Sequence, residues 1–168
     1  IMVQRTRNPR LATRIVATMD EEMGIYGMES IIFLVPRDEN APIYYLLAIL
    51  NSKLINHLYA TKFLNVAVKA EYLKDTPIPR ADPKDEKALD KLAKCILSAR
   101  RTDTSVNTSK WEHEIDSIVY KLYGLTADEI AIVEGANISP KKAEKQVNVP
   151  RTVKAKTKSV LVDDEGLD

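Results

Sequence analysis

The sequence predicts an α+β fold, in which a small antiparallel or mixed sheet packs against a long helix and a helical segment follows. Three observations predict this class. Short β-branched runs dominate residues 1–35, one apolar stripe at helical spacing begins near residue 42, and helix caps recur after residue 80. We therefore expect three regions, at residues 1–80, 81–135 and 136–168.

The strands are expected in the first region, where β-branched residues alternate with polar ones. The runs that fit are Met2–Thr6, Thr13–Met19 and Ser30–Val35, with Val66–Lys69 as a further short strand. Between the second and third runs, Gly24 and Gly27 predict a hairpin loop over residues 21–27.

A long helix is predicted over about residues 42–61. Apolar residues recur there at three- and four-residue steps and form one stripe, made of Ile43, Leu47, Leu50, Leu54 and Leu58. Pro42 fits the first turn of this helix. Pro77 and Pro79 then predict an extended exit, because each proline disfavours helical geometry in the residue before it.

The second region reads as three helices, at about 83–101, 109–123 and 127–134. Their expected end signals are an Asp82–Pro83 start, capping boxes at Ser109/Glu112 and Thr126/Glu129, and left-handed C-caps at Gly124 and Gly135. Residues 136–168 form a basic and then acidic tail, for which we expect at most one strand.

Composition narrows the class of protein. Apolar residues make up 45% and charged residues 29% of the 168 residues, which is enough to bury a core and argues against wholesale disorder. The single Cys95 cannot form an internal disulfide and fits the cytoplasm. No apolar run approaches the ~20 residues that cross a bilayer, so we expect no membrane. The chain begins at Ile1, and we expect it to be a piece of a longer protein.

The residues of catalysis are scarce. Two histidines and one cysteine predict no metal cluster, and five glycines contain no phosphate-binding loop. Asp75 with Asp85-Glu86-Lys87 loosely matches a metal-nuclease set, but the latter acids fall in a first helical turn, where they serve the helix dipole. We predict no catalytic residue and no metal site in this chain.

The basic N-terminal segment, residues 1–14, is the best candidate for a binding site. Lys plus Arg (25) nearly balances Asp plus Glu (24) overall, yet residues 1–14 hold four arginines and no acid. Arginine forks fit phosphates and guanine edges, and short polar side chains read bases. The predicted DNA-binding residues are Arg5, Arg7, Asn8, Arg10 and Arg14, a second group of Lys62, Asn65 and Lys69, and the loop aromatic Tyr26. Solvated charges on an edge strand explain the arginines equally well.

Several stretches resemble one family when taken in order. Residues 12–20 (ATRIVATMD) and 29–36 (ESIIFLVP) resemble the paired strands of a DNA target recognition domain, and residues 45–56 (YLLAILNSKLIN) resemble its helix. Residues 72–79 (YLKDTPIP) resemble the exit into a helical spacer. Residues 114–135 look like the terminal segment of type IIG restriction-modification enzymes, which are adenine-specific DNA methyltransferases fused to a nuclease; type I specificity subunits are similar.

The resemblance implies a module that reads double-stranded DNA in the major groove. Residues 1–80 would be the recognition domain and residues 81–135 a spacer that packs on an upstream methyltransferase/nuclease domain or subunit. This chain would bind no cofactor, because S-adenosylmethionine and Mg²⁺ would belong to those parts. One departure is that residues 65–69 (NVAVK) replace the family's glycine-rich turn and Phe-Pro-Lys element.

Two alternatives remain open. The neutral overall charge and the capped helices also fit a non-catalytic protein-interaction or assembly module of a larger complex. An enzyme that acts alone is the more distant alternative, because the sequence contains no recognisable catalytic centre.

Overall fold

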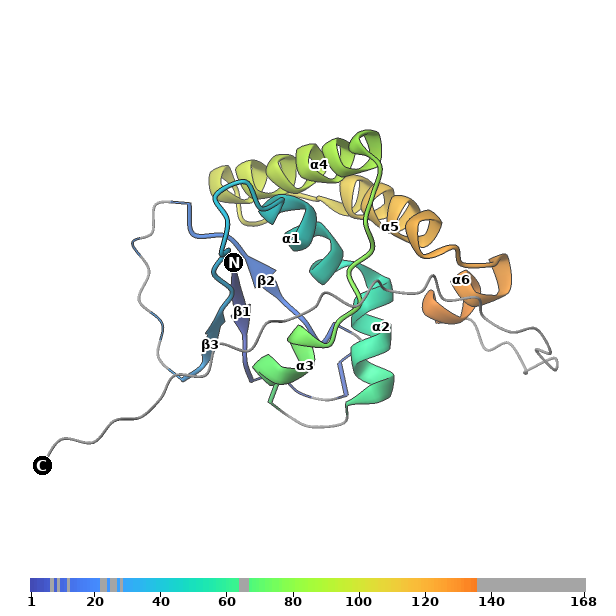
Figure 1. Cartoon of the computed structure of the whole chain (residues 1–168), viewed down its shortest axis with the longest axis horizontal. Helices are drawn as coiled ribbons and strands as arrows, with labels where there is room; N and C mark the ends of the chain where they lie inside the picture. The colour runs from blue at the N-terminus through green and yellow to red at the C-terminus, as the bar shows by residue number, and fades with distance from the viewer. Residues whose placement is uncertain are drawn as a thin grey trace, which may run out of the picture. The chain divides into compact units, whose positions relative to one another are not determined.

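The computed structural model describes residues 1–6, 8, 10–11, 13–21, 24, 27, 29–63 and 67–135. Within this part, three short strands form one antiparallel sheet and six helices follow, so the predicted α+β class is confirmed (Figure 1). The strand predicted in residues 136–168 lies outside the described residues.

The sheet has the order β2-β1-β3, with β1 at Met2–Gln4, β2 at Ala17–Thr18 and β3 at Ile31–Phe33. Val3 stands at its centre, facing Ala17 on one side and Ile32 on the other. Each strand is shorter than the predicted run that contains it. Thr6 extends the pattern as an isolated antiparallel bridge to Ala67, within the predicted fourth strand.

The predicted long helix is two helices. α1 covers Ile43–Asn51 and α2 covers Lys53–Lys62, because Ser52 between them is extended, with ψ 153°. The Ser52 hydroxyl donates to the Ile49 carbonyl (2.7 Å) and accepts from Ile55 N–H (3.4 Å), so it caps both ends at the break. A short helix that the sequence reading missed, α3 at Ala70–Lys74, precedes the extended exit.

The later helices agree with prediction to within one or two residues: α4 at Pro83–Thr102, α5 at Ser109–Tyr123 and α6 at Ala127–Val133. Asp82 caps α4, and Thr126 with Glu129 forms the predicted capping box. Gly124 is left-handed at φ 67°. The capping box predicted at Ser109 is wrong, because Ser109 is already helical and Thr108 is the N-cap.

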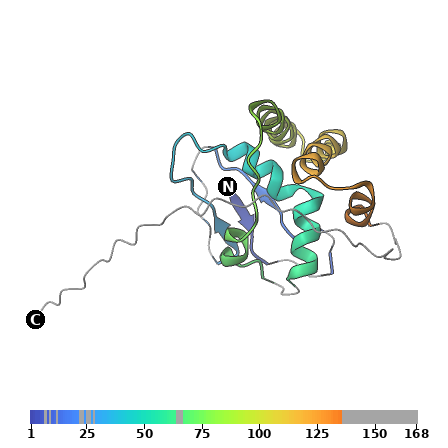
Figure 2. The same ribbon diagram turned by 45° about the vertical axis from the view of Figure 1, so that its right-hand side comes forward.

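One hydrophobic core runs through this part of the chain. It joins Val3 and Ile15 of the sheet region to α1 and α2 and, across residue 80, to Leu89 on α4 and Val119 on α5. Residues 1–135 accordingly belong to one compact unit. Figures 1 and 2 show α4 and α5 along one end of this unit, and α3 with the last turn of α2 at the opposite end.

Candidate nucleic-acid interface

The structure brings Arg5, from the first predicted basic group, beside the backbone of residues 67–69, which lie about 60 residues further along the chain. Val68 N–H donates to the Arg5 carbonyl at 2.6 Å, next to the bridge between Thr6 and Ala67. The backbone of Arg5 therefore runs beside residues 67–69. Arg5 and Lys69 are both exposed on neighbouring segments.

Two stacked aromatic rings lie between the lysines of this surface. The Phe63 and Tyr72 ring centroids are 3.9 Å apart with 8° between the ring planes. The ammonium of Lys62 lies 5.4 Å from the Phe63 centroid, and that of Lys69 lies 5.5 Å from the Tyr72 centroid. Both distances suit cation–π attraction. We call these four residues, together with Arg5, the basic–aromatic cluster.

The buried residue Tyr59 packs against the cluster. Its ring, which is only 2% exposed, packs 4.9 Å from that of Phe63, and its hydroxyl accepts from Lys69 N–H at 3.3 Å. Burial raises the pKa of Tyr59, so this hydroxyl stays neutral. The rings of the cluster therefore pack on a buried tyrosine, while Lys62 and Lys69 are exposed.

Arg14 does not belong to this exposed surface. Arg14 is 0% exposed, and its guanidinium carbon lies 5.9 Å from the Tyr59 centroid. The cause is long-range, because the side-chain oxygen of Asn56 on α2 accepts from Arg14 N–H (2.6 Å) and Ile15 N–H (2.7 Å). This attachment draws the segment into the core. The predicted role of Arg14 as a DNA contact is therefore corrected to that of a buried support.

The other predicted DNA-binding residues fall into two groups, those within the described residues and those outside them. Asn8 and Arg10 are exposed, and the side-chain oxygen of Asn8 accepts from Arg10 N–H at 3.0 Å, which shapes the loop after β1. The Arg5 guanidinium also donates to the Glu29 carbonyl at 3.1 Å. Arg7, Tyr26 and Asn65 lie outside the described residues.

Two asparagines of the helix motif hold the strand segment in place. The Asn51 side-chain amide pairs with the backbone of Ala17, accepting from its N–H at 2.9 Å and donating to its carbonyl at 3.0 Å. The Asn56 side-chain oxygen accepts from the N–H groups of Arg14 and Ile15. The Asn51 amide thus takes the place of a neighbouring strand at the outer edge of β2. Sequence reasoning missed this role, and the only signal was an amide on the side of the helix that becomes buried.

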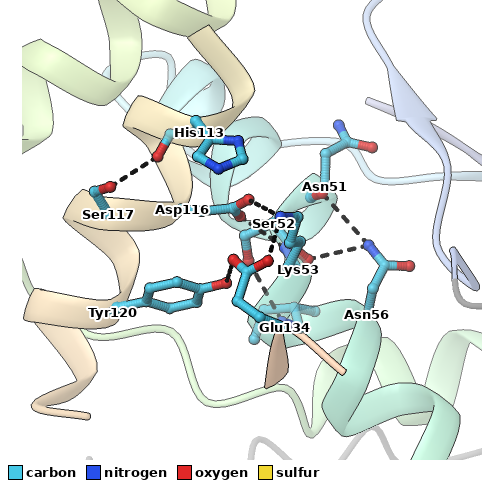
Figure 3. A network of polar contacts seen from close by, with 10 residues as sticks. Asn51, Ser52, Lys53, Asn56, His113, Asp116, Ser117, Tyr120 and Glu134 are labelled. Carbon is cyan, nitrogen blue, oxygen red and sulfur yellow. Dashed lines mark hydrogen bonds and ion pairs between the residues drawn. The ribbon is translucent and has the colours of Figure 1, made fainter. Parts of the chain in front are cut away.

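A second polar network joins α2, α5 and α6 (Figure 3). Lys53 N–H donates to Asp116 at 2.8 Å, and the Lys53 ammonium pairs with Glu134 at 2.6 Å. Tyr120 OH donates to Glu134 at 2.8 Å. Burial raises the pKa of Asp116, whereas the hydrogen bond from Lys53 lowers the pKa of Glu134. All four residues have partners within the network, so its evident role is to hold the helices together.

The aromatic pair was also missed by sequence reasoning. Lys62 immediately precedes Phe63, and Lys69 precedes Tyr72 by three residues, so a search for aromatic residues near the predicted lysines would have found both. Among residues 1–135, as far as they are described, no three His, Cys, Asp or Glu side chains gather closely enough to hold a metal ion. In the same part of the chain, no helix is long and apolar enough to cross a membrane.

Comparison with protein-family models, with curated proteins and with solved structures finds no match for this chain.

Proposed function

We propose that this chain is the sequence-specific DNA-recognition module of a restriction-modification protein. The observation that carries the proposal is the basic–aromatic cluster, in which the exposed Lys62 and Lys69 lie against two stacked rings and the Arg5 backbone runs beside residues 67–69. The family resemblance of the sequence supplies the class of protein.

The side chains of the cluster suit different parts of a DNA duplex. Lys62 and Lys69 are point charges on flexible stems and match phosphates. Arg5 has a planar fork that can pair with the O6 and N7 atoms of guanine in the major groove. The exposed loop residues Asn8 and Arg10 follow the same strand and extend the surface. The proposed interface also includes Arg7, Tyr26 and Asn65.

Chemistry would be performed elsewhere. The proposed partner is an adenine-specific methyltransferase and nuclease, as a domain or a subunit, which would bind S-adenosylmethionine and Mg²⁺. The proposed setting is the cytoplasm, where the half-buried thiol of Cys95 remains reduced.

The proposal is tested by measuring duplex binding of the 168-residue chain by fluorescence anisotropy over a series of salt concentrations. The double variant Lys62→Gln/Lys69→Gln removes two phosphate contacts, so the slope of log K against log salt should fall by about 1.8. The matched control is Arg37→Gln/Lys110→Gln, which removes two exposed cations on segments outside the cluster. Identical binding by the double variant and the wild type would contradict the proposal, as would no duplex binding at all.

A protein-interaction module is the second candidate, and an apolar surface favours it. Val35 is 81% exposed, and with Leu34 and Ile78 it borders a hollow of about 530 Å³ beside the edge strand β3. Sedimentation separates the two candidates. Self-association that Val35→Asp abolishes, in a chain that retards no duplex, would favour the interaction module.

A further inference from the structure

Helix α4 carries a row of cations along its solvent-facing side. The cations follow one another at steps of three, four or seven residues, which places them on one helix face. The row consists of Lys84, Lys87, Lys91, Lys94 and Arg101, all exposed, and we call it the lysine stripe. At 1.5 Å per residue it extends over about 26 Å.

The acids of α4 are segregated from most of the stripe. Asp85 is buried and accepts from Lys121 on α5 at 2.9 Å, and Glu86 is half-buried. Only Asp90 borders the stripe, where it pairs with Lys94 at 2.7 Å. Residues 80–134 hold eleven acidic and nine basic residues, yet the exposed side of α4 is lined mainly by cations.

Three cations of the stripe have no salt bridge within the described part of the chain. Arg101 pairs with Glu21 at 2.6 Å and Lys94 lies 4.4 Å from the Tyr44 ring, so these two are already engaged. Lys84, Lys87 and Lys91 have no such ion pair among the described residues. These three ammonium groups therefore have no direct ion pair with a described residue, although Lys84 also acts at longer range on the Asp82 carboxylate, whose pKa it helps to lower.

A hollow adjoins the lysine stripe between α4 and α5. Its volume is about 590 Å³, and its lining includes Lys87, Asp90, Lys91 and Lys94 on α4 and the half-buried Trp111 on α5. The apolar face of α4 is meanwhile committed to the core through Leu89. A partner that approaches this part of α4 from solvent therefore meets three lysines, one aromatic ring and the carboxylate of Asp90, which is paired with Lys94.

We propose that the lysine stripe is a second, sequence-independent binding surface for the phosphates of DNA. Lysine suits this role because an ammonium contacts phosphate without selecting a base. Figures 1 and 2 place α4 at the opposite end of the unit from α3 and the end of α2, where the basic–aromatic cluster lies. The stripe would thus hold DNA outside the sequence that the cluster reads. This inference rests on the proposed function only in taking DNA as the ligand.

The test compares charge-removal variants of the whole 168-residue chain on a labelled duplex of random sequence. Lys84→Gln/Lys87→Gln/Lys91→Gln removes the three cations without an ion pair and keeps good helix formers in α4. The matched control, Arg37→Gln/Arg80→Gln/Lys110→Gln, removes three exposed cations that lie outside both surfaces. Circular dichroism confirms that each variant is folded.

The stripe variant should bind the random duplex more weakly, with a slope of log K against log salt that is smaller by two to three. The control should match the wild type, and the preference for a selected site over random sequence should be unchanged. A stripe variant that binds like the control would overturn the inference. It would also be overturned if the stripe mattered only for binding labelled poly-glutamate, which would indicate an acidic protein partner.

The same measurements separate this inference from the proposed function. If Lys62→Gln/Lys69→Gln weakens binding and the stripe variant does not, the inference alone fails. If only the stripe variant weakens binding, the cluster is not the DNA-binding site and the lysine stripe is. If the wild type binds no duplex, both fail.

Discussion

Helices α4 to α6 and the N-terminal sheet region are held together in different ways. The helices end on local signals, such as Asp82 before α4 and Gly124 after α5. The strands are two or three residues long, and their outer segment is fixed by amides of Asn51 and Asn56, more than 30 residues away. The comparison shows that one region is specified locally, whereas the other depends on the helix it packs against.

The largest loss of stability is expected for a core substitution that tests whether the two regions share one core. Leu89 on α4 is 0% exposed and belongs to the cluster that contains Val3 and Ile15. Leu89→Ala should cost about 2–5 kcal/mol of unfolding free energy, because it leaves a cavity. Urea unfolding should show a single transition that shifts for both helix and tertiary signals. Ile132→Ala, at a side chain that is 46% exposed, is the control and should change little. Two separate transitions, with only one shifted, would show two independent cores.

A smaller loss of stability is expected for a substitution on α2 that tests whether the sheet region depends on this helix. Asn56→Ala leaves Arg14 N–H and Ile15 N–H buried without their acceptor, at a cost of about 1–3 kcal/mol for each. The loss should appear in urea unfolding and should accelerate amide exchange at residues 14–17. Asn40→Ala, at an exposed turn, is the control. Unchanged exchange at Ile15 would mean that Asn56 does not hold the segment.

The smallest effect concerns the pH dependence of the network between α2 and α5. Because burial raises the pKa of Asp116 in the folded chain, its protonation favours folding, and this contribution is lost as pH rises through the folded pKa. Asp116→Asn retains an acceptor for Lys53 N–H and carries no charge. The free energy of unfolding of the variant minus that of the wild type should be larger near pH 7 than near pH 3. A difference that grows as pH falls would contradict the raised pKa.

Glu134 provides the opposite control in the same network. The hydrogen bond from Lys53 lowers its pKa, so its contribution to stability is present above the unfolded pKa and is lost as pH falls. Glu134→Gln should therefore reduce the acid sensitivity of the chain. The two substitutions should shift the pH–stability curve in opposite directions when unfolding is followed from pH 3 to 7.

The same contrast explains how far the sequence predicts the fold. The bounds of α4, α5 and α6 follow from capping residues within a few positions, which a sequence displays directly. The break at Ser52 is harder to predict, because the apolar stripe continues across it. Ser52 is a local cap, but the first N–H of α2 bonds to Asp116, far along the chain. Five-residue α3 is too short to show a helical period.

The candidate site divides in the same way. Lys62, Asn65 and Lys69 were predicted as a second polar-basic group. Their distance from residues 5 and 6 in the sequence hid the bridge between Thr6 and Ala67. The burial of Arg14 depends on Asn56, so no local pattern distinguishes it from the exposed arginines. A composition argument thus names the cations, and long-range hydrogen bonds decide which of them face solvent.

The central claim is that the basic–aromatic cluster contacts DNA, and an NMR titration tests it most directly. A duplex is first selected from a randomised library by the 168-residue chain and then added to ¹⁵N-labelled protein. The account predicts shift changes centred on Arg5, Phe63, Lys69 and Tyr72, with smaller changes along α4. Shift changes confined to the apolar surface around Val35, or absent from residues 62–72, would contradict it.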